Sequence, residues 1–224
     1  YGAAVNEQQV RQNAEYMGKH LKDFGWEYVV VDIQWYQPSA SSHAYEPFAP
    51  LTMDEWGRLT PAVNRFPSAA NGQGFKPLAD YVHSLGLKFG IHIMRGLPRM
   101  AAHNHLKIFG SEYTCADAAN PNSICMWNPD MYGTRLGSEA AKAYYRSIFA
   151  LYAEWGVDYL KYDYCYKPGA ADGANLYRRM GMALRNCGRD IVFSACNWGA
   201  DGVHEWIRQT GAQLFRSTGD IQDN

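Results

Sequence analysis

Five repeats of one pattern, a helix followed by a glycine and then a strand, restrict what this 224-residue chain can fold into. In each repeat apolar residues recur at helical spacing, a glycine ends the helix, and an apolar run follows. The five glycines are Gly25, Gly86, Gly156, Gly188 and Gly211. The strands after them are predicted at residues 28–33, 87–94, 157–163, 191–196 and 214–220. Such repeats are typical of α/β proteins with parallel strands.

Two α/β architectures fit this pattern, a doubly wound sheet and a (β/α)8 barrel. The glycine-rich phosphate loops of many doubly wound nucleotide binders are missing, because no G-x-G-x-x-G or G-K-[ST] follows any predicted strand. We therefore favour the barrel, in a single domain. Because the chain starts at Tyr1 instead of Met and stops at Asn224 after a strand-like segment, we expect residues 1–224 to be a barrel truncated at both ends.

The charges of the chain nearly cancel, with 21 Lys and Arg against 22 Asp and Glu and no block of either sign. Nucleic acid and anionic membrane surfaces are therefore not expected as partners. No apolar run approaches the roughly 18 residues that cross a bilayer. We see no targeting segment in the chain as given, so secretion and a cytoplasmic location both stay open.

Two predicted strands are followed by segments far longer than the usual α/β connection. About 40 residues follow Trp35 and about 40 follow Met94, whereas connections of about 2–6 residues are common. Both segments leave the carboxyl end of a strand, where barrel enzymes build their active sites. Both are rich in aromatic residues, which either stack on sugar rings or pack the segments onto the domain.

Polar side chains gather at the predicted strand ends. They are Asp32, His92, Lys161, Asp163, Asn197, Arg216 and Asp220. Lys161 shares a strand face with Asp163 and keeps its carboxylate ionised, although a structural ion pair explains the motif equally well. Glycosidic hydrolysis needs two carboxyl groups, and Asp163 and Asp220 fit that need. A separation of about 5–5.5 Å predicts retention of configuration, and about 6.5–9.5 Å predicts inversion.

Two other classes of function remain open at this point. Asp32, His92 and Asp163 could ligate a divalent metal, although H-x-H and H-E-x-x-H are both missing. A sugar-binding module without catalysis would need only the aromatic residues. The five cysteines lack C-x-x-C spacing, so no structural zinc is expected. Cys187 and Cys196 are interpreted as buried thiols, and one disulfide is expected among the remaining three, Cys115, Cys125 and Cys165.

Several motifs together resemble one known family. They are Y-V-V-V-D at 28–32, R-F-P-S at 65–68, A-D-Y-V-H-S-L-G-L-K-F-G-I at 79–91, W-G-V-D-Y-L-K-Y-D-Y-C at 155–165, S-A-C-N-W-G at 194–199 and R-S-T-G-D-I at 216–221. The chain resembles the α-galactosidases of glycoside hydrolase family 27. The resemblance implies a (β/α)8 barrel followed by a β-sandwich domain, with the first strand, the last two strands and the sandwich outside this chain.

The resemblance also implies an activity, retaining hydrolysis of terminal α-galactosyl residues in small carbohydrates or glycans, without metal or cofactor. Asp163 would be the nucleophile and Asp220 the general acid/base. The expected substrate-binding residues are Asp32, Trp35, His92, Lys161, Asn197, Trp198 and Arg216. Cys165 matches a cysteine that bridges to a preceding loop, so Cys115 or Cys125 would be its partner. Oligomer formation stays open.

Departures from the family pattern concern the choice of sugar. Ile33 stands where the family usually has a second aspartate, which grips the axial 4-hydroxyl of galactose. His92 stands where a tyrosine is usual, and Arg95 and Arg99 begin a longer segment in which they either contact substrate or brace the insertion. The reaction type therefore follows from the resemblance more directly than the sugar. An α-N-acetylgalactosaminide, a β-L-arabinopyranoside and an α-glucan remain alternatives.

Overall fold

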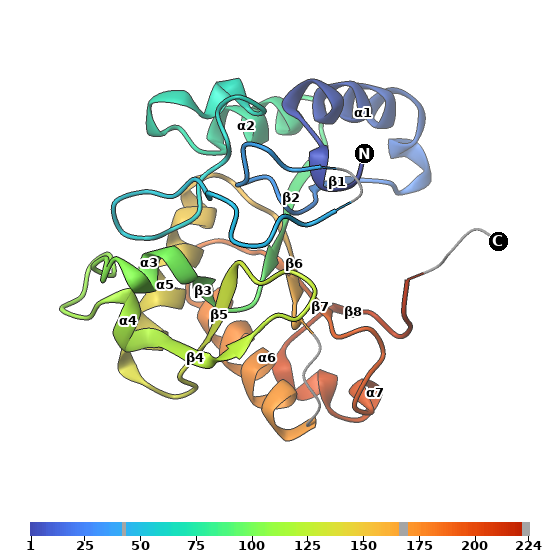
Figure 1. Cartoon of the computed structure of the whole chain (residues 1–224). Helices are drawn as coiled ribbons and strands as arrows, with labels where there is room; N and C mark the ends of the chain where they lie inside the picture. The colour runs from blue at the N-terminus through green and yellow to red at the C-terminus, as the bar shows by residue number, and fades with distance from the viewer. Residues whose placement is uncertain (42–43, 166–169, 221–224) are drawn as a thin grey trace.

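A five-stranded parallel sheet forms the centre of the protein (Figure 1). The computed structural model describes residues 1–41, 44–165 and 170–220, without the side chains of residues 170–172. The strands are β1 (Tyr28–Val31), β2 (Lys88–Met94), β6 (Tyr159–Asp163), β7 (Val192–Cys196) and β8 (Leu214–Phe215), and they lie side by side in this order. A parallel strand is present at all five predicted places, but β8 ends at Phe215, so Asp220 lies beyond the strand predicted at 214–220. Within the described residues β1 and β8 are the outer strands, and no closed barrel is seen.

A helix precedes each of these strands. The helices are α1 (Glu7–His20), α2 (Lys76–Ser84), α5 (Glu139–Glu154), α6 (Ala170–Arg185) and α7 (Val203–Trp206), with short 3-10 segments at Gly2–Ala4, Lys22–Phe24, Pro67–Gly72 and Ile207–Thr210. Asn6 caps α1, and a capping box with Gln9 satisfies two backbone N–H groups. No helix of the described segments is long and apolar enough to cross a membrane.

The long segment after Met94 contains a second sheet that the sequence did not predict. It is antiparallel and consists of β3 (Leu97–Pro98), β5 (Met131–Thr134) and β4 (Ala119–Ile124), accompanied by α3 (Arg99–His103) and α4 (Cys115–Ala118). The strand signal is weak here because β3 has two residues and β4 is the polar run A-N-P-N-S-I. In Figure 1 this sheet lies beside the carboxyl half of β2.

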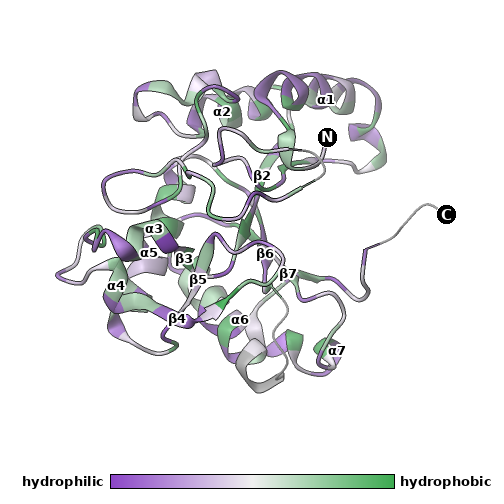
Figure 2. Cartoon of the chain, viewed as in Figure 1, coloured by the Kyte–Doolittle hydropathy of each residue, from purple (hydrophilic) through white to green (hydrophobic). Residues whose placement is uncertain are grey.

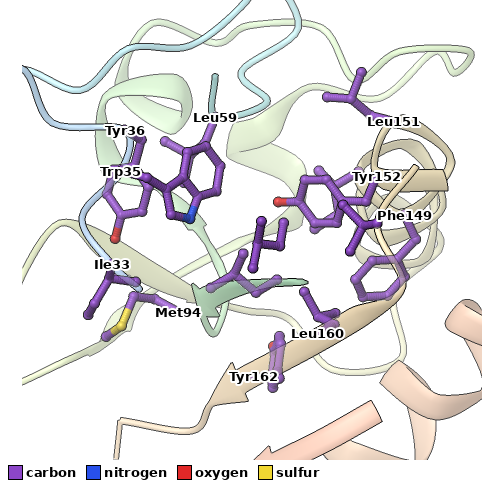
Figure 3. Close-up of a cluster of buried hydrophobic side chains, with 14 of the residues drawn as sticks. Ile33, Trp35, Tyr36, Leu59, Met94, Phe149, Leu151, Tyr152, Leu160 and Tyr162 are labelled. Atoms are coloured by element: carbon purple, nitrogen blue, oxygen red, sulfur yellow. The ribbon is translucent and has the colours of Figure 1, made fainter. Parts of the chain in front are cut away.

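The hydrophobic core lies between the parallel sheet and its helices. Residues 89–94 of β2 are all buried. Figure 2 shows β2 as largely hydrophobic (green), whereas α1 is largely hydrophilic (purple). Figure 3 shows Trp35 and Leu59 facing Tyr152 of α5, with Leu160 of β6 below them in this view. Burial of such large side chains contributes about 1.5–3 kcal/mol each. The core thus fixes the ends of β2 and β6, which carry His92 and Asp163.

Candidate active site

Residues from the ends of all five parallel strands line one pocket of about 310 Å³. The lining residues are Asp32, Ile33, Tyr45, His92, Trp127, Lys161, Asp163, Trp198, Arg216 and Asp220. The parallel register explains this gathering, because His92 of β2 pairs with Lys161 of β6, and Met94 pairs with Asp163. The pocket size lies in the range of small-molecule sites, about 300–1,000 Å³.

Asp163 lies at the base of this pocket with its side chain fixed on both oxygens. Asp163 is only 2 % exposed to solvent. Oδ1 accepts a hydrogen bond from the backbone N–H of Cys165 at 2.6 Å. Oδ2 accepts from the indole Nε1 of Trp198 at 3.3 Å and from the thiol of Cys196 at 3.4 Å. The carboxylate is therefore held in one orientation before any ligand binds. Burial and the negative charge of Asp163 raise the pKa of the Cys196 thiol to about 12, so this thiol stays protonated and donates.

His92 lies between two carboxylates. Its Nδ1 is hydrogen-bonded to Asp32, and its Nε2 is 3.8 Å from Oδ2 of Asp163, which is too long for a hydrogen bond. Lys161 Nζ is 3.9 Å from Asp32. Burial raises the pKa of Asp32, but the hydrogen bond and charge of His92, the charge of Lys161 and the N–H of Ile33 together lower it to about 2. Asp32 is therefore ionised at all ordinary pH values.

Asp220 and Arg216 lie on the opposite side of the pocket, after β8. Arg216 Nη1 donates to Asp220 Oδ1 at 2.7 Å, and this bond raises the pKa of the guanidinium. The Asp220 side chain is 57 % exposed, whereas Asp163 is buried. The two carboxyl groups thus differ in access to water.

Three aromatic rings form one wall of the pocket. The Tyr45 and Trp127 ring centroids are 5.0 Å apart, and those of Trp127 and Trp198 are 6.1 Å apart. Burial and the charges of Asp32, Asp163 and Asp220 raise the pKa of the Tyr45 hydroxyl, which therefore remains a donor. Tyr45 and Trp127 were not among the expected site residues. Their sequence signal, aromatic character in a long segment, is shared by many residues that pack elsewhere.

The structure does not bring two expected substrate-binding residues into the pocket. Trp35 is fully buried in the core, and its indole donates to the carbonyl of His92 at 2.8 Å. Trp35 thus contacts the backbone of His92 and does not line the pocket. Asn197 is 2 % exposed and donates to the carbonyl of Ala200 at 2.8 Å, so it shapes the turn that presents Trp198.

A disulfide joins Cys125 to Cys165. This pairing is one of the two that the resemblance left open, and it attaches the segment carrying Trp127 to the end of β6. Cys115, the other expected partner, is a buried thiol that contacts the carbonyl of Trp56.

Asp32, His92 and Asp163 are the three residues that the sequence offers as metal ligands. In the described part of the chain no group of three or more His, Cys, Asp or Glu side chains is arranged to hold a metal ion. His92 directs one ring nitrogen to each carboxylate.

Parallel α/β units with a carboxylate-lined pocket at the carboxyl ends of their strands are typical of (β/α)8-barrel enzymes. Comparison with known proteins narrows this class. A melibiase family model described as alpha galactosidase A matches residues 2–105 and 124–224. The chain therefore belongs to this α-galactosidase family, glycoside hydrolase family 27.

Individual relatives agree with this assignment. The chain is 34 % identical over 225 residues to an α-galactosidase from Cyamopsis tetragonoloba, covering all of this chain and 42 % of the relative. A family 27 β-L-arabinopyranosidase structure from Geobacillus stearothermophilus has 52 % identity and a TM-score of 0.93, over all of this chain and 52 % of that one. A Bacillus halodurans structure with a provisional α-N-acetylgalactosaminidase assignment has 55 % identity and a TM-score of 0.79, over 87 % of this chain and 45 % of that one. The chain thus spans about half the length of these relatives.

Proposed function

We propose that the pocket is the active site of a retaining glycoside hydrolase that removes terminal pyranosyl residues of galactose-like configuration. The observation that carries this proposal is the buried, doubly fixed carboxylate of Asp163 at the base of a pocket with an aromatic wall. Family membership supports the same reaction class. No cofactor enters the proposed reaction.

Asp163 is the proposed nucleophile. In a retaining mechanism a carboxylate attacks the anomeric carbon and forms a covalent glycosyl-enzyme. The N–H of Cys165 and the indole of Trp198 fix the orientation of the Asp163 carboxylate, so little entropy is lost when the sugar arrives. Lys161 and Asp32 lie beside it and provide donors and acceptors for the sugar hydroxyls.

Asp220 is the proposed general acid/base. It must protonate the leaving oxygen and then deprotonate a water molecule, so it needs contact with solvent. Its half-exposed side chain at the edge of the pocket meets that need. Arg216 holds one oxygen of Asp220 and leaves the other for the leaving group.

β-L-Arabinopyranosides are the substrates that the pocket favours within this class. β-L-Arabinopyranose has the ring configuration of α-D-galactopyranose without the hydroxymethyl group. Ile33 replaces the family's second aspartate, and its apolar side chain lines the pocket. A hydroxymethyl oxygen facing Ile33 would lose its hydrogen bonds, which costs about 1–3 kcal/mol. The 52 % identity to a β-L-arabinopyranosidase supports this order of substrates.

Terminal α-galactosides are the second candidate, supported by 34 % identity to a plant α-galactosidase. The test is a panel of nitrophenyl glycosides assayed with the full-length protein: β-L-arabinopyranoside, α-galactoside, α-N-acetylgalactosaminide and α-glucoside. We expect kcat/KM for the arabinopyranoside to exceed that for the galactoside by about 10-fold or more. An Ile33→Asp variant restores a hydrogen-bond acceptor. It should lower the ratio of kcat/KM for the arabinopyranoside to kcat/KM for the galactoside.

Two variants test the mechanism. Asp163→Asn should lower kcat by several orders of magnitude, and Asp80→Asn, at an exposed ion pair of α2, serves as the matched control with unchanged turnover. NMR of the first-formed product anomer should show retention. Near-normal activity of Asp163→Asn would remove the nucleophile assignment, and an inverted product would remove the double displacement.

A further inference from the structure

Arg95, directly after β2, is a buried cation to which the described residues provide no counter-charge. It is 7 % exposed, and no ion pair of its guanidinium is found among the described residues. Nη1 donates to the hydroxyl of Ser123 at 2.8 Å, while Nε is buried and has no hydrogen-bond partner in the described part of the chain. The Tyr164 ring, with its centroid 5.9 Å from the guanidinium carbon, provides a weak cation–π contact. A buried charge normally needs stronger compensation.

The Arg95 side chain borders a separate cavity of about 130 Å³, here called the Arg95 cavity. Polar lining is provided by Arg95, Asn120, Ser123 and Thr134, and the described lining contains no Asp or Glu. None of these residues lines the candidate active site. The cavity lies where the antiparallel sheet meets α5 and α6, since Tyr145 and Leu176 complete its wall.

The backbone around the Arg95 cavity leaves room for the guanidinium. A Cβ added at Gly133 of β5 would lie 2.5 Å from Nη1 of Arg95 and 2.6 Å from the hydroxyl of Ser123. Any side chain at this position would therefore displace the cation or its partner. The arrangement is built around a positively charged group with unused hydrogen-bonding capacity.

We propose that the Arg95 cavity binds a small oxyanion, of which phosphate and a carboxylate are the two simplest forms. A guanidinium presents several N–H groups that match the oxygens of such an anion, and Nη1 of Arg95 has one hydrogen bond, to Ser123, among the described residues. The Ser123 hydroxyl accepts from Arg95 and can still donate its own hydrogen, and Asn120 adds a side-chain amide to the lining, whereas the Thr134 hydroxyl is already hydrogen-bonded to Tyr145. The ligand would supply the counter-charge that the described chain lacks. This proposal does not depend on the glycosidase activity.

The experiment measures the thermal melting of the full-length protein in Tris–chloride buffer as sodium phosphate or sodium acetate replaces sodium chloride at constant ionic strength. A saturable rise in Tm is expected with at least one of the two oxyanions, because a ligand that binds the folded state stabilises it. Calorimetric titration gives the Kd. Tighter binding of phosphate identifies a tetrahedral oxyanion, and tighter binding of acetate identifies a carboxylate.

Arg95→Gln should raise that Kd by ~10-fold or more. Arg99→Gln is the matched control, because Arg99 lies four residues further along the same segment but donates to the carbonyl of Pro129 and does not line the Arg95 cavity. Equal binding in Arg95→Gln, or no saturable effect of either oxyanion on the wild type, overturns the proposal. Should Arg95→Gln not fold, wild-type crystals soaked in phosphate and in acetate decide the matter. An oxyanion at Arg95 supports the proposal, and density for neither there overturns it.

Discussion

Removal of the Cys125–Cys165 disulfide should both destabilise the protein and disturb its pocket. The bond closes a loop with a sequence separation of 40 residues. In the chain-entropy model a loop of this length stabilises the folded state by about 4 kcal/mol. The double variant Cys125→Ala/Cys165→Ala should therefore unfold in urea with a free energy of unfolding lower by about 2–4 kcal/mol, since the measured values tend to fall below the model.

The effect on activity should exceed what unfolding alone explains. The backbone N–H of Cys165 holds Oδ1 of Asp163, and Cys125 lies two residues before Trp127 in the aromatic wall. At a temperature where the double variant is still folded by circular dichroism, kcat on a nitrophenyl glycoside should fall by about 10-fold or more. Cys187→Ala, a change of a free, half-buried thiol away from the pocket, is the control. A loss of stability below about 1 kcal/mol with normal kcat would refute the reasoning.

Three further outcomes are expected. Asp220→Ala should slow hydrolysis of glycosides with poor leaving groups far more than that of activated aryl glycosides, and equal losses would contradict its role as acid. Trp35→Phe removes the donor to the carbonyl of His92. The free energy of unfolding, measured in urea, should fall by about 1–3 kcal/mol while KM stays nearly unchanged. A raised KM at unchanged stability would mean that Trp35 contacts the substrate directly. Because the pKa of Asp32 is lowered to about 2, its charge stabilises the folded state fully above about pH 4, and this contribution is lost as the pH falls through about 2. In Asp32→Asn the free energy of unfolding should therefore fall less steeply between about pH 4 and 2 than in the wild type.

The parallel sheet was predictable because its signals are local. Helix caps, glycine stops and apolar runs each lie within one repeat, so each strand can be located without knowledge of distant contacts. Asp32, His92, Lys161 and Asp163 reach one pocket because parallel strands end at one edge of the sheet. These positions required no knowledge of the loops.

The positions that the sequence did not predict depend on contacts between distant segments. Trp35 was expected near substrate because it follows a strand, but β1 ends at Val31 and the chain then turns the indole into the core. Tyr45 and Trp127 meet across two long segments, and one of these is attached to β6 through Cys165. The antiparallel sheet likewise depends on the pairing of β4 with β5, which cannot be predicted from the polar, proline-containing sequence of β4.

The pocket residues are distributed over five successive strands, so the pocket is complete only when the whole sheet has folded. Asp32 follows the first of these strands and Arg216 the last, at a sequence separation of 184 residues. No run of two or three successive repeats contains both Asp32 and Asp220. Partly folded molecules, whatever helical content they have, therefore lack a complete site. Sugar binding would therefore indicate that the whole sheet has formed, whereas a spectroscopic measure of secondary structure also detects partly folded molecules.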